Sequence, residues 1–402
     1  MTRARIRQPR RRSAGFTLVE LMVALVVGAL VVAAIFTLGG ASAHHFQEQQ
    51  RVGVTQRAVR MAMDRVRRDL SRAGYLSAPS SRSPFVRTCP SPAPPRNVDA
   101  VWFADDDVAG NAALDTVNRS ANGVSTDRLR LIGNYATGDQ YLVRTINTAG
   151  NQIFLQTDWL AFRRSFVTGS GASATVDTQR FDDVFRAGRM LHIETRGGFR
   201  YFVDITGSTV NSSGTVATVS ISPGLGVDNP CLEGLGRGAL VAPLSEVEYF
   251  IGPPQPGSNL APRTNAVTGP NTILYRRELN MDDGSELAGT RRPILEFAVD
   301  FNLDFIVDTN LTPTNPPNIQ RQDGPAVQNR VQNQPWQVRG AVVSLAARTP
   351  EQDRRFPWPD SWGSARPATA PLNRYQVFPG QEGAARVRQL TTEVSMPNMV
   401  PR

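Results

Sequence analysis

Histidine and cysteine are scarce in this 402-residue sequence and lysine is absent, and the scarcity of histidine and cysteine excludes several classes of function. Of the three histidines, His44 and His45 are adjacent and His192 lies far from both. None of them has the spacing of a zinc site such as HExxH. The sequence also lacks a G-x-S-x-G nucleophile elbow, a phosphate-binding loop and a dinucleotide-binding fingerprint. We therefore predict no enzymatic activity, no metal site and no cofactor.

Two groups of acidic residues have only a superficial likeness to cation sites. Residues 105–107 are three consecutive aspartates, without the alternating ligands and glycine turn of a calcium loop, so we expect a solvated loop. Asp300, Asn302 and Asp304 alternate with apolar residues. That alternation predicts that all three lie on the outward face of a strand.

Every one of the 44 basic residues is an arginine, and the net charge is +9. Six of these arginines lie in the first 12 residues, where there is no acid, so the basic character belongs largely to that segment. It therefore gives no specific indication of nucleic-acid binding. The two cysteines, Cys89 and Cys231, could form one disulfide in an oxidising compartment. Two free thiols are the alternative, because the sequence does not show whether the Cα atoms approach each other.

The longest apolar run, residues 16–38, contains a single charged side chain, Glu20. At about 1.5 Å per residue a helix of this length spans roughly 35 Å, which is enough to cross a bilayer. A carboxylate in hydrocarbon costs several kcal/mol unless it is paired, so Glu20 is a candidate functional residue. The arginines before Gly15 predict a cytoplasmic N-terminus and export of everything after Leu38.

Residues 15–20 read Gly-Phe-Thr-Leu-Val-Glu after a short basic leader. This pattern resembles the prepilin signal of type IV pilins and type II pseudopilins. The resemblance implies that a prepilin peptidase cleaves after Gly15 and that Phe16 becomes an N-methylated N-terminus. Glu20 would then be the fifth mature residue and would pair with the N-terminal amine of a neighbouring subunit. An ordinary signal anchor remains an alternative, whereas a secretory or twin-arginine signal does not account for the glutamate.

Helical character continues beyond the apolar run. Gly39 and Gly40 interrupt that run and could soften the helix locally, and Gly74 predicts its end. Between them, residues 44–73 predict an amphipathic helix. Its apolar stripe consists of Val52, Val59, Met63, Val66 and Leu70. In pilins, the first half of such a helix lies in the membrane or filament core and the second half packs on a globular domain.

From residue 77 onward the sequence predicts β structure. Alternating or β-rich runs favour strands at 127–133, 140–146, 190–195, 199–205, 216–221, 245–251, 271–279, 336–347 and 386–396. The clearest strand is 295–307, where apolar residues alternate with mostly polar ones. Gly197 and Gly198 predict a tight hairpin. Loops rich in Pro, Asn or Gly are expected near 79–95, 252–270 and 308–335, the last as an exposed insertion.

These patterns predict an α+β chain of four parts. They are a basic leader at 1–15, a transmembrane or filament-core helix at 16–38, an amphipathic continuation at 39–76 and an exported β-rich domain at 77–402, in one lobe or two. The resemblance gives the whole a type IV pilin-like fold: a long N-terminal helix followed by a large antiparallel β-sheet domain.

A narrower resemblance covers parts of the β-rich domain. The matching segments are 245–250 (SEVEYF), 274–277 (LYRR), 294–305, Trp336 with 340–348, and 390–394 (LTTEV). In this order they resemble the large minor pilins of the PilW type and, less closely, the minor pseudopilin J of type II secretion. Residues 101–188 resemble no family.

The resemblance implies assembly rather than catalysis. A minor pilin of this kind helps to prime a pilus and lies at its tip, with other minor pilins, the major pilin, the prepilin peptidase, the inner-membrane assembly platform and lipid as partners. Before assembly it would be a single-pass inner-membrane protein with a periplasmic β-rich domain. Two alternatives remain open: a type II secretion pseudopilin, and an adhesive or DNA-binding tip module.

Overall fold

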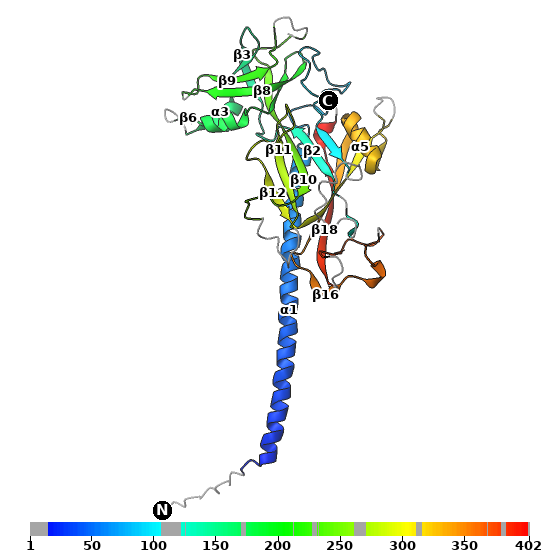
Figure 1. The fold of residues 1–402 in the computed structure, drawn as a ribbon. Coiled ribbons are helices and arrows are strands. Elements are labelled where there is room, and N and C mark those ends of the chain that lie inside the picture. Colours follow the sequence, from blue (N-terminus) through cyan, green and yellow to red (C-terminus); the bar gives the residue numbers. More distant parts are fainter. Residues whose placement is uncertain are drawn as a thin grey trace, which may run out of the picture. The chain divides into compact units, whose positions relative to one another are not determined.

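A computed structural model describes the chain from residue 15 to residue 400 with several gaps (Figure 1). The described residues are 15–105, 122–124, 126–169, 174–211, 213–226, 231, 233–260, 271–310, 316–367, 369–378 and 383–400. Most of the leader, two of the three aspartates at 105–107, and much of the predicted loop at 252–270 therefore lie outside the described residues. The chain divides into two compact units, Met1–Val54 and Thr55–Arg402, and each is described by itself.

Helix α1 (Leu18–Ser71) has 54 residues and runs through Gly39 and Gly40 without interruption. In the first unit its apolar side chains, such as Leu30 and Ile35, are exposed. By length and composition, α1 is the one described helix that could cross a membrane. The apolar run therefore forms the helix that the sequence predicts.

In the second unit, the end of α1 packs into the protein core. Val59, Met63, Val66 and Leu70 are all buried, as their common stripe predicts. The helix ends at Ser71, and Gly74 follows with a φ of +72°, a left-handed conformation that favours glycine. The Gly74 amide donates a hydrogen bond of 2.9 Å to the carbonyl of Ile132 and so directs the chain onto the sheet.

The larger described sheet is antiparallel and has ten strands. They are β1 (Val101–Ala104), β2 (Arg128–Gly133), β3 (Tyr141–Ile146), β4 (Gln152–Leu155), β7 (Met190–Glu194), β8 (Arg200–Val210), β9 (Ala217–Ser222), β10 (Leu240–Gly252), β11 (Ile273–Leu279) and β12 (Arg292–Glu296). The first part of β10 pairs with β3 and β7, and its second part pairs with β2 and β11. Pairing runs from β10 through β3, β4, β9, β8 and β7 back to β10, which closes a barrel-like ring.

A second antiparallel sheet has six strands in the described part of the chain. They are β13 (Ala298–Asp308), β14 (Ile319–Gln322), β15 (Val338–Arg348), β16 (Asp353–Pro357), β17 (Arg374–Tyr375) and β18 (Gly383–Ser395). The remaining elements are the strand pair β5 (Val167–Thr168) and β6 (Thr175–Val176), the helices α3 (Leu160–Phe166), α4 (Thr178–Val184) and α5 (Gly324–Asn333), and the 3-10 turns η4 (Pro335–Gln337), η5 (Asp360–Trp362) and η6 (Pro397–Met399).

Two large apolar cores hold this unit together. The first lies where α1 meets both sheets and includes Val66, Tyr249 and Phe301. The second belongs to the barrel-like ring and to α3 and α4, where Phe166 and Phe181 pack with ring centroids 5.1 Å apart. The predicted fold class, a long N-terminal helix followed by a large antiparallel β-sheet domain, is confirmed.

The strand predicted at 295–307 is interrupted, so its predicted alternation is wrong in part. Phe297, with a φ of +53°, lies between β12 and β13, and a register shift between Ala298 and Asp300 follows at the start of β13. The extra residue reverses the faces of the strand locally. Val299 consequently joins a separate small core beside β17 and β18, and Asp300, predicted to face solvent, is only 5% exposed.

The segment 308–335 also differs from its prediction as an exposed insertion. It contains β14, which pairs with β13, and α5. Val327 and Val331, four residues apart on α5, are fully buried in the first core. Two valines on one helical face thus pack into the core from a segment whose composition is otherwise polar.

Candidate functional site: the N-terminal segment and the polar contacts of α1

The N-terminal segment is open to reaction and to contact with other molecules. Gly15, Phe16 and Thr17 precede α1, and a Cβ atom added at Gly15 would meet no atom within 4 Å. Phe16 is 85% exposed. The bond after Gly15 and the residue that would follow cleavage are therefore accessible.

Thr17 and Glu20 form a capping box at the start of α1. The Thr17 amide and hydroxyl donate to Glu20 Oε2 over 2.9 and 3.0 Å, and the Glu20 amide donates to Thr17 Oγ1 over 3.3 Å. These bonds occupy amides that would otherwise have no partner in the first helical turn. Thr-x-x-Glu is the sequence signature of this cap, and our sequence analysis did not use it.

Asp69, near the other end of α1, has partners that are distant in the sequence. Its Oδ2 accepts hydrogen bonds from Arg276 Nε (2.6 Å) and from the Tyr249 hydroxyl (2.7 Å). Its backbone carbonyl accepts a third from the Tyr135 hydroxyl (2.8 Å). We call Asp69, Tyr135, Tyr249 and Arg276 the Asp69 cluster. It joins α1 to β10 and β11.

Burial sets the protonation states in the Asp69 cluster. Burial, and after it the charge of Asp69, raises the pKa of Tyr249 and that of Tyr135. Both hydroxyls therefore remain protonated and donate. Burial alone would lower the pKa of Arg276, but Asp69 and Tyr249 outweigh it and the pKa is raised. The Arg276 guanidinium therefore stays charged beside Asp69.

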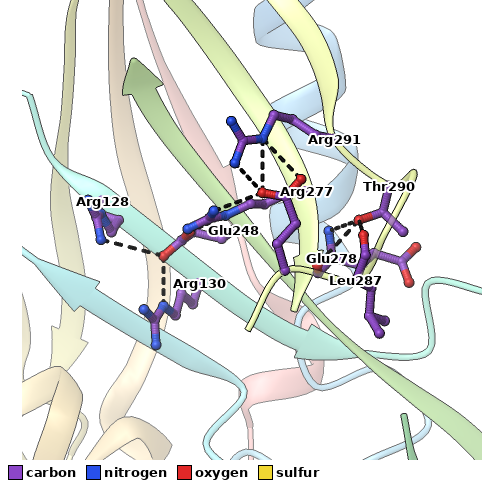
Figure 2. Close-up of polar contacts among 9 residues, drawn as sticks. Arg128, Arg130, Glu248, Arg277, Glu278, Leu287, Thr290 and Arg291 are labelled. Atoms are coloured by element: carbon purple, nitrogen blue, oxygen red, sulfur yellow. Dashed lines mark hydrogen bonds and ion pairs between the residues drawn. The ribbon is translucent and has the colours of Figure 1, made fainter. Parts of the chain in front are cut away.

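A second polar cluster surrounds Glu248 of β10 (Figure 2). Glu248, whose side chain is 0% exposed, accepts from Arg130 Nε (2.9 Å) and Arg277 Nε (2.7 Å), and Arg128 lies 4.0 Å away. Arg277 also reaches Glu286 (2.9 Å), which pairs with Arg291. We call these six residues the Glu248 cluster. Burial would raise the pKa of Glu286, but Arg291 and Arg277 outweigh it and lower that pKa.

The two clusters explain how segments 245–250 and 274–277 work together. Strands β10 and β11 pair with Glu248 opposite Arg277 and Tyr249 opposite Arg276. Because side chains alternate between the faces of a strand, the first pair covers one face and the second pair reaches α1 on the other. The sequence analysis singled out both segments but not Asp69.

The structure brings the two cysteines together. Cys89 and Cys231 form a disulfide with their Cα atoms 6.0 Å apart across 142 residues of sequence. In the chain-entropy model a loop of this length contributes at most about 4 to 5 kcal/mol. Both cysteines belong to the second core, so the bond ties segment 79–95 to the barrel-like ring.

The described residues offer no metal-binding cluster. No three His, Cys, Asp or Glu side chains among them are grouped so that they could hold a metal ion. His192 is buried in β7. The predicted functional residues Gly15, Phe16 and Glu20 share the N-terminal segment, far along the sequence from the two clusters of the β-rich domain.

Comparison with known proteins finds one family match. The family described as "Prokaryotic N-terminal methylation motif" matches residues 10–36. No curated protein matches the chain. A solved structure of a type IV-like pilin from Thermus thermophilus aligns over 55% of this chain and 92% of its own, with 10% identity and a TM-score of 0.19. A TM-score this low does not establish a shared fold. What the comparisons do establish is that the chain carries a prepilin-type N-terminal methylation motif, which ends within its apolar helix.

Proposed function

We propose that this chain is the precursor of a type IV pilin subunit. A prepilin peptidase cleaves it after Gly15 and methylates Phe16, and the mature subunit assembles through α1. One observation carries the proposal: the methylation motif at 10–36 overlaps a helix long and apolar enough to cross a membrane, with Glu20 as the only charge in its apolar run. Gly15 and Phe16 are accessible, as processing requires.

Assembly through α1 follows from the position of Glu20. In lipid, a carboxylate without a cationic partner is costly, and the capping box gives Glu20 only neutral donors. The amine of a neighbouring Phe16 supplies the missing positive charge, so docking of a second helix replaces an isolated charge by a pair. Pairing at this one position also sets the register between helices.

Within this class, we propose the role of a PilW-type minor pilin that primes assembly at the pilus tip. The resemblance rests in part on segments 245–250 and 274–277. These segments supply Tyr249 and Arg276 to the Asp69 cluster, which joins α1 to β10 and β11, and this structural role supports the proposal. A β-rich domain of this size is also bulky for repeated use along a shaft. The parts are the leader at 1–15, the membrane or filament-core helix at 16–38, its continuation at 39–76 and the exported domain at 77–402.

The partners proposed are the prepilin peptidase, the inner-membrane assembly platform, other minor pilins, the major pilin and membrane lipid. The subunit waits in the inner membrane with its N-terminus in the cytoplasm, and then moves to the cell surface. A type II secretion pseudopilin uses the same signal and the same helix chemistry, so it is the second candidate.

Processing is tested first, with Gly15→Leu. We expect this variant to remain at the precursor mass, because a large side chain replaces the small residue at the cleaved bond. Gly28→Leu is the matched control, since a Cβ atom at Gly28 also meets nothing within 4 Å. Intact-mass measurement of membrane fractions separates precursor from mature chain. A Gly15→Leu chain of mature mass would contradict cleavage at this site.

Deletion of the gene then separates the two candidate assemblies. Sheared surface pili and the secreted-protein profile are scored in the same cultures. Loss of pili with normal secretion supports a pilus-priming subunit. Intact pili with defective secretion would instead assign the chain to the pseudopilins.

A further inference from the structure

A pocket of about 260 Å³ lies beside the last turns of α1, and we call it the arginine pocket. Its described lining includes Arg65, Arg68, Asp69, Arg72, Tyr135 and Arg276. Four of these side chains are arginines and Asp69 is the one acid in the described lining, which leaves a surplus of three positive charges. All of them belong to the second unit, so the pocket does not depend on how the membrane helix is placed.

Three of the arginines lie on one face at the end of α1. Arg65 and Arg68 belong to the helix and Arg72 follows it directly, at spacings of three and four residues. The side chain of Arg65 is 42% exposed, and Arg68 is also exposed. Like charges at this spacing repel each other. An anion placed among them would remove that repulsion.

The other two guanidinium groups are fixed by the protein. One amino group of Arg72 donates hydrogen bonds to the backbone carbonyls of Asn134 and Thr137. Arg276 is held by its bond of 2.6 Å to Asp69. A ligand that contacts these groups does not have to order them, which favours binding.

Asp69 does not cancel the positive charge of the pocket. Its carboxylate is only 6% exposed, and its Oδ2 is bound to Arg276. Arg65 lies 3.9 Å from Oδ1, too far for a hydrogen bond. Arg68 makes no ion pair with a described carboxylate, and its Nε donates to the backbone carbonyl of Asp64 over 3.2 Å. Arg65 and Arg68 therefore keep donors for a ligand.

Two further carboxylates lie near the pocket without lining it. Glu278 acts on Arg276 but forms an ion pair of 2.8 Å with Arg189. Asp64 is exposed on α1 and is absent from the described lining. The positive surplus therefore belongs to the arginine pocket itself.

Charge and geometry favour a phosphate group over a carboxylate. A carboxylate carries one negative charge, whereas a phosphate monoester carries nearly two at neutral pH. The donors come from α1 and from β11, so they can reach oxygens that point in different directions, as in a tetrahedral phosphate. One arginine fork is enough for a planar carboxylate. The volume equals that of roughly nine water molecules at liquid density, which leaves room for one phosphate and part of its hydration water.

We propose that the arginine pocket binds phosphate, either free or as a soluble phosphate monoester. Arg65 and Arg68 donate hydrogen bonds to its outer oxygens, and the fixed guanidinium groups of Arg72 and Arg276 supply positive charge from the wall. This inference is independent of the pilus assignment.

Isothermal titration calorimetry on the full-length chain in a nonionic detergent tests the site. Inorganic phosphate is the probe, at about pH 7.5 and constant ionic strength, with acetate as the singly charged comparison. We expect one phosphate to bind per chain and acetate to bind about tenfold more weakly or not at all. Arg68→Gln should weaken phosphate binding by about tenfold or more, because it removes a charge-assisted hydrogen bond.

Arg67→Gln is the matched control. It removes the same charge from the neighbouring residue, which is exposed and is absent from the described lining, so affinity should change by less than about twofold. If Arg68→Gln does not fold, as judged by its thermal transition, Arg65→Gln replaces it in the same comparison. Equal weakening by the control and the pocket variant would mean unspecific attraction. That result, no phosphate binding, or equal affinity for acetate would overturn the proposal.

A second titration distinguishes a soluble phosphate from a lipid headgroup, which offers related chemistry. Phosphate binding is measured again in micelles that contain phosphatidylglycerol. Unchanged binding supports a soluble ligand. Competition by the lipid, abolished in Arg68→Gln, would overturn that choice and assign the arginine pocket to a headgroup phosphate.

Discussion

The two parts of helix α1 differ in the exposure of their apolar side chains, although they belong to one continuous helix. In the first unit, apolar side chains such as Leu30 are exposed, whereas Val66 and Leu70 in the second unit are fully buried. The first part therefore keeps its apolar surface for lipid or for other helices. The second part buries its apolar surface in the core of the β-rich domain.

The carboxylates of the two parts differ in the same way. Glu20 makes its described hydrogen bonds with Thr17, three residues away. Asp69 binds Tyr249 and Arg276, which arrive from strands about 200 residues further along the sequence, at separations of 180 and 207. An acid with only local, neutral partners is available to another molecule. An acid whose partners come from distant elements stabilises the fold instead.

The largest expected effect concerns Glu20, where two substitutions distinguish its role as a helix cap from the role of its charge. Glutamine serves as well as glutamate in a capping box but carries no charge. We therefore expect Glu20→Gln to keep α1 intact and Glu20→Val to lose the cap, while both reduce co-purification of other minor pilins at least tenfold. Cleavage after Gly15 should be largely unaffected in both variants. Normal co-purification with Glu20→Gln would show that charge pairing is not what recruits neighbours.

Asp69→Asn should cause the next largest change, and in stability rather than assembly. It leaves the buried Arg276 guanidinium without its carboxylate, and breaking such a buried pair costs about 3 to 5 kcal/mol. Urea unfolding of the full-length chain in detergent, followed by tyrosine and tryptophan fluorescence, measures the loss. Arg67→Ala, on the exposed face of the same helix, should stay within about 0.5 kcal/mol. A similar small change for Asp69→Asn would remove the distinction between the two carboxylates.

A matched pair of leucines compares the two parts of α1 directly. Leu70→Ala removes a fully buried side chain and should lower the free energy of unfolding of the β-rich domain by about 2 to 5 kcal/mol. Leu30→Ala alters an exposed position of the apolar run and should leave that unfolding unchanged. The same urea titration serves for both variants. Equal losses would contradict the division of the helix into an open part and a packed part.

The smallest expected effect concerns Asp204, a carboxylate whose charged form is disfavoured by its surroundings. Burial and the nearby Asp282 raise the pKa of Asp204 to about 6, with Arg96 opposing. The folded chain thus holds this proton more tightly than the unfolded chain, whose pKa is about 4. Its contribution to stability is present below pH 4 and is lost as the pH rises through 6. Because Asp204 is about half exposed, we expect only about 1 kcal/mol.

The variant Asp204→Asn isolates this effect. His192, whose pKa burial lowers to about 3, acts with the opposite sign, since its contribution is lost as the pH falls below about 6.5. The difference between wild type and Asp204→Asn cancels the histidine contribution. Parallel stability curves for the two chains between pH 4 and 7 would disprove the assignment to Asp204.

Local patterns predicted most of this architecture. The 3.6-residue spacing of Val59, Met63, Val66 and Leu70 identified the buried face of α1, and alternation located strands such as β2, β3 and β13. Patterns failed where one residue changed the register, as at Phe297, and where two valines docked a polar segment, as on α5. Asp69 could not be recognised, because its partners lie on β10 and β11 and only the tertiary fold brings them to it.

The Cys89–Cys231 disulfide also determines how the chain responds to a pulling force. The two cysteines are 142 positions apart, and strands β1 to β9 lie between them. Fully extended, that length of chain would reach roughly 480 Å. A load applied between α1 and the C-terminal strands passes through the sulfur atoms instead. These strands therefore cannot be drawn out in series, and the tension falls on β10 and the elements that follow it.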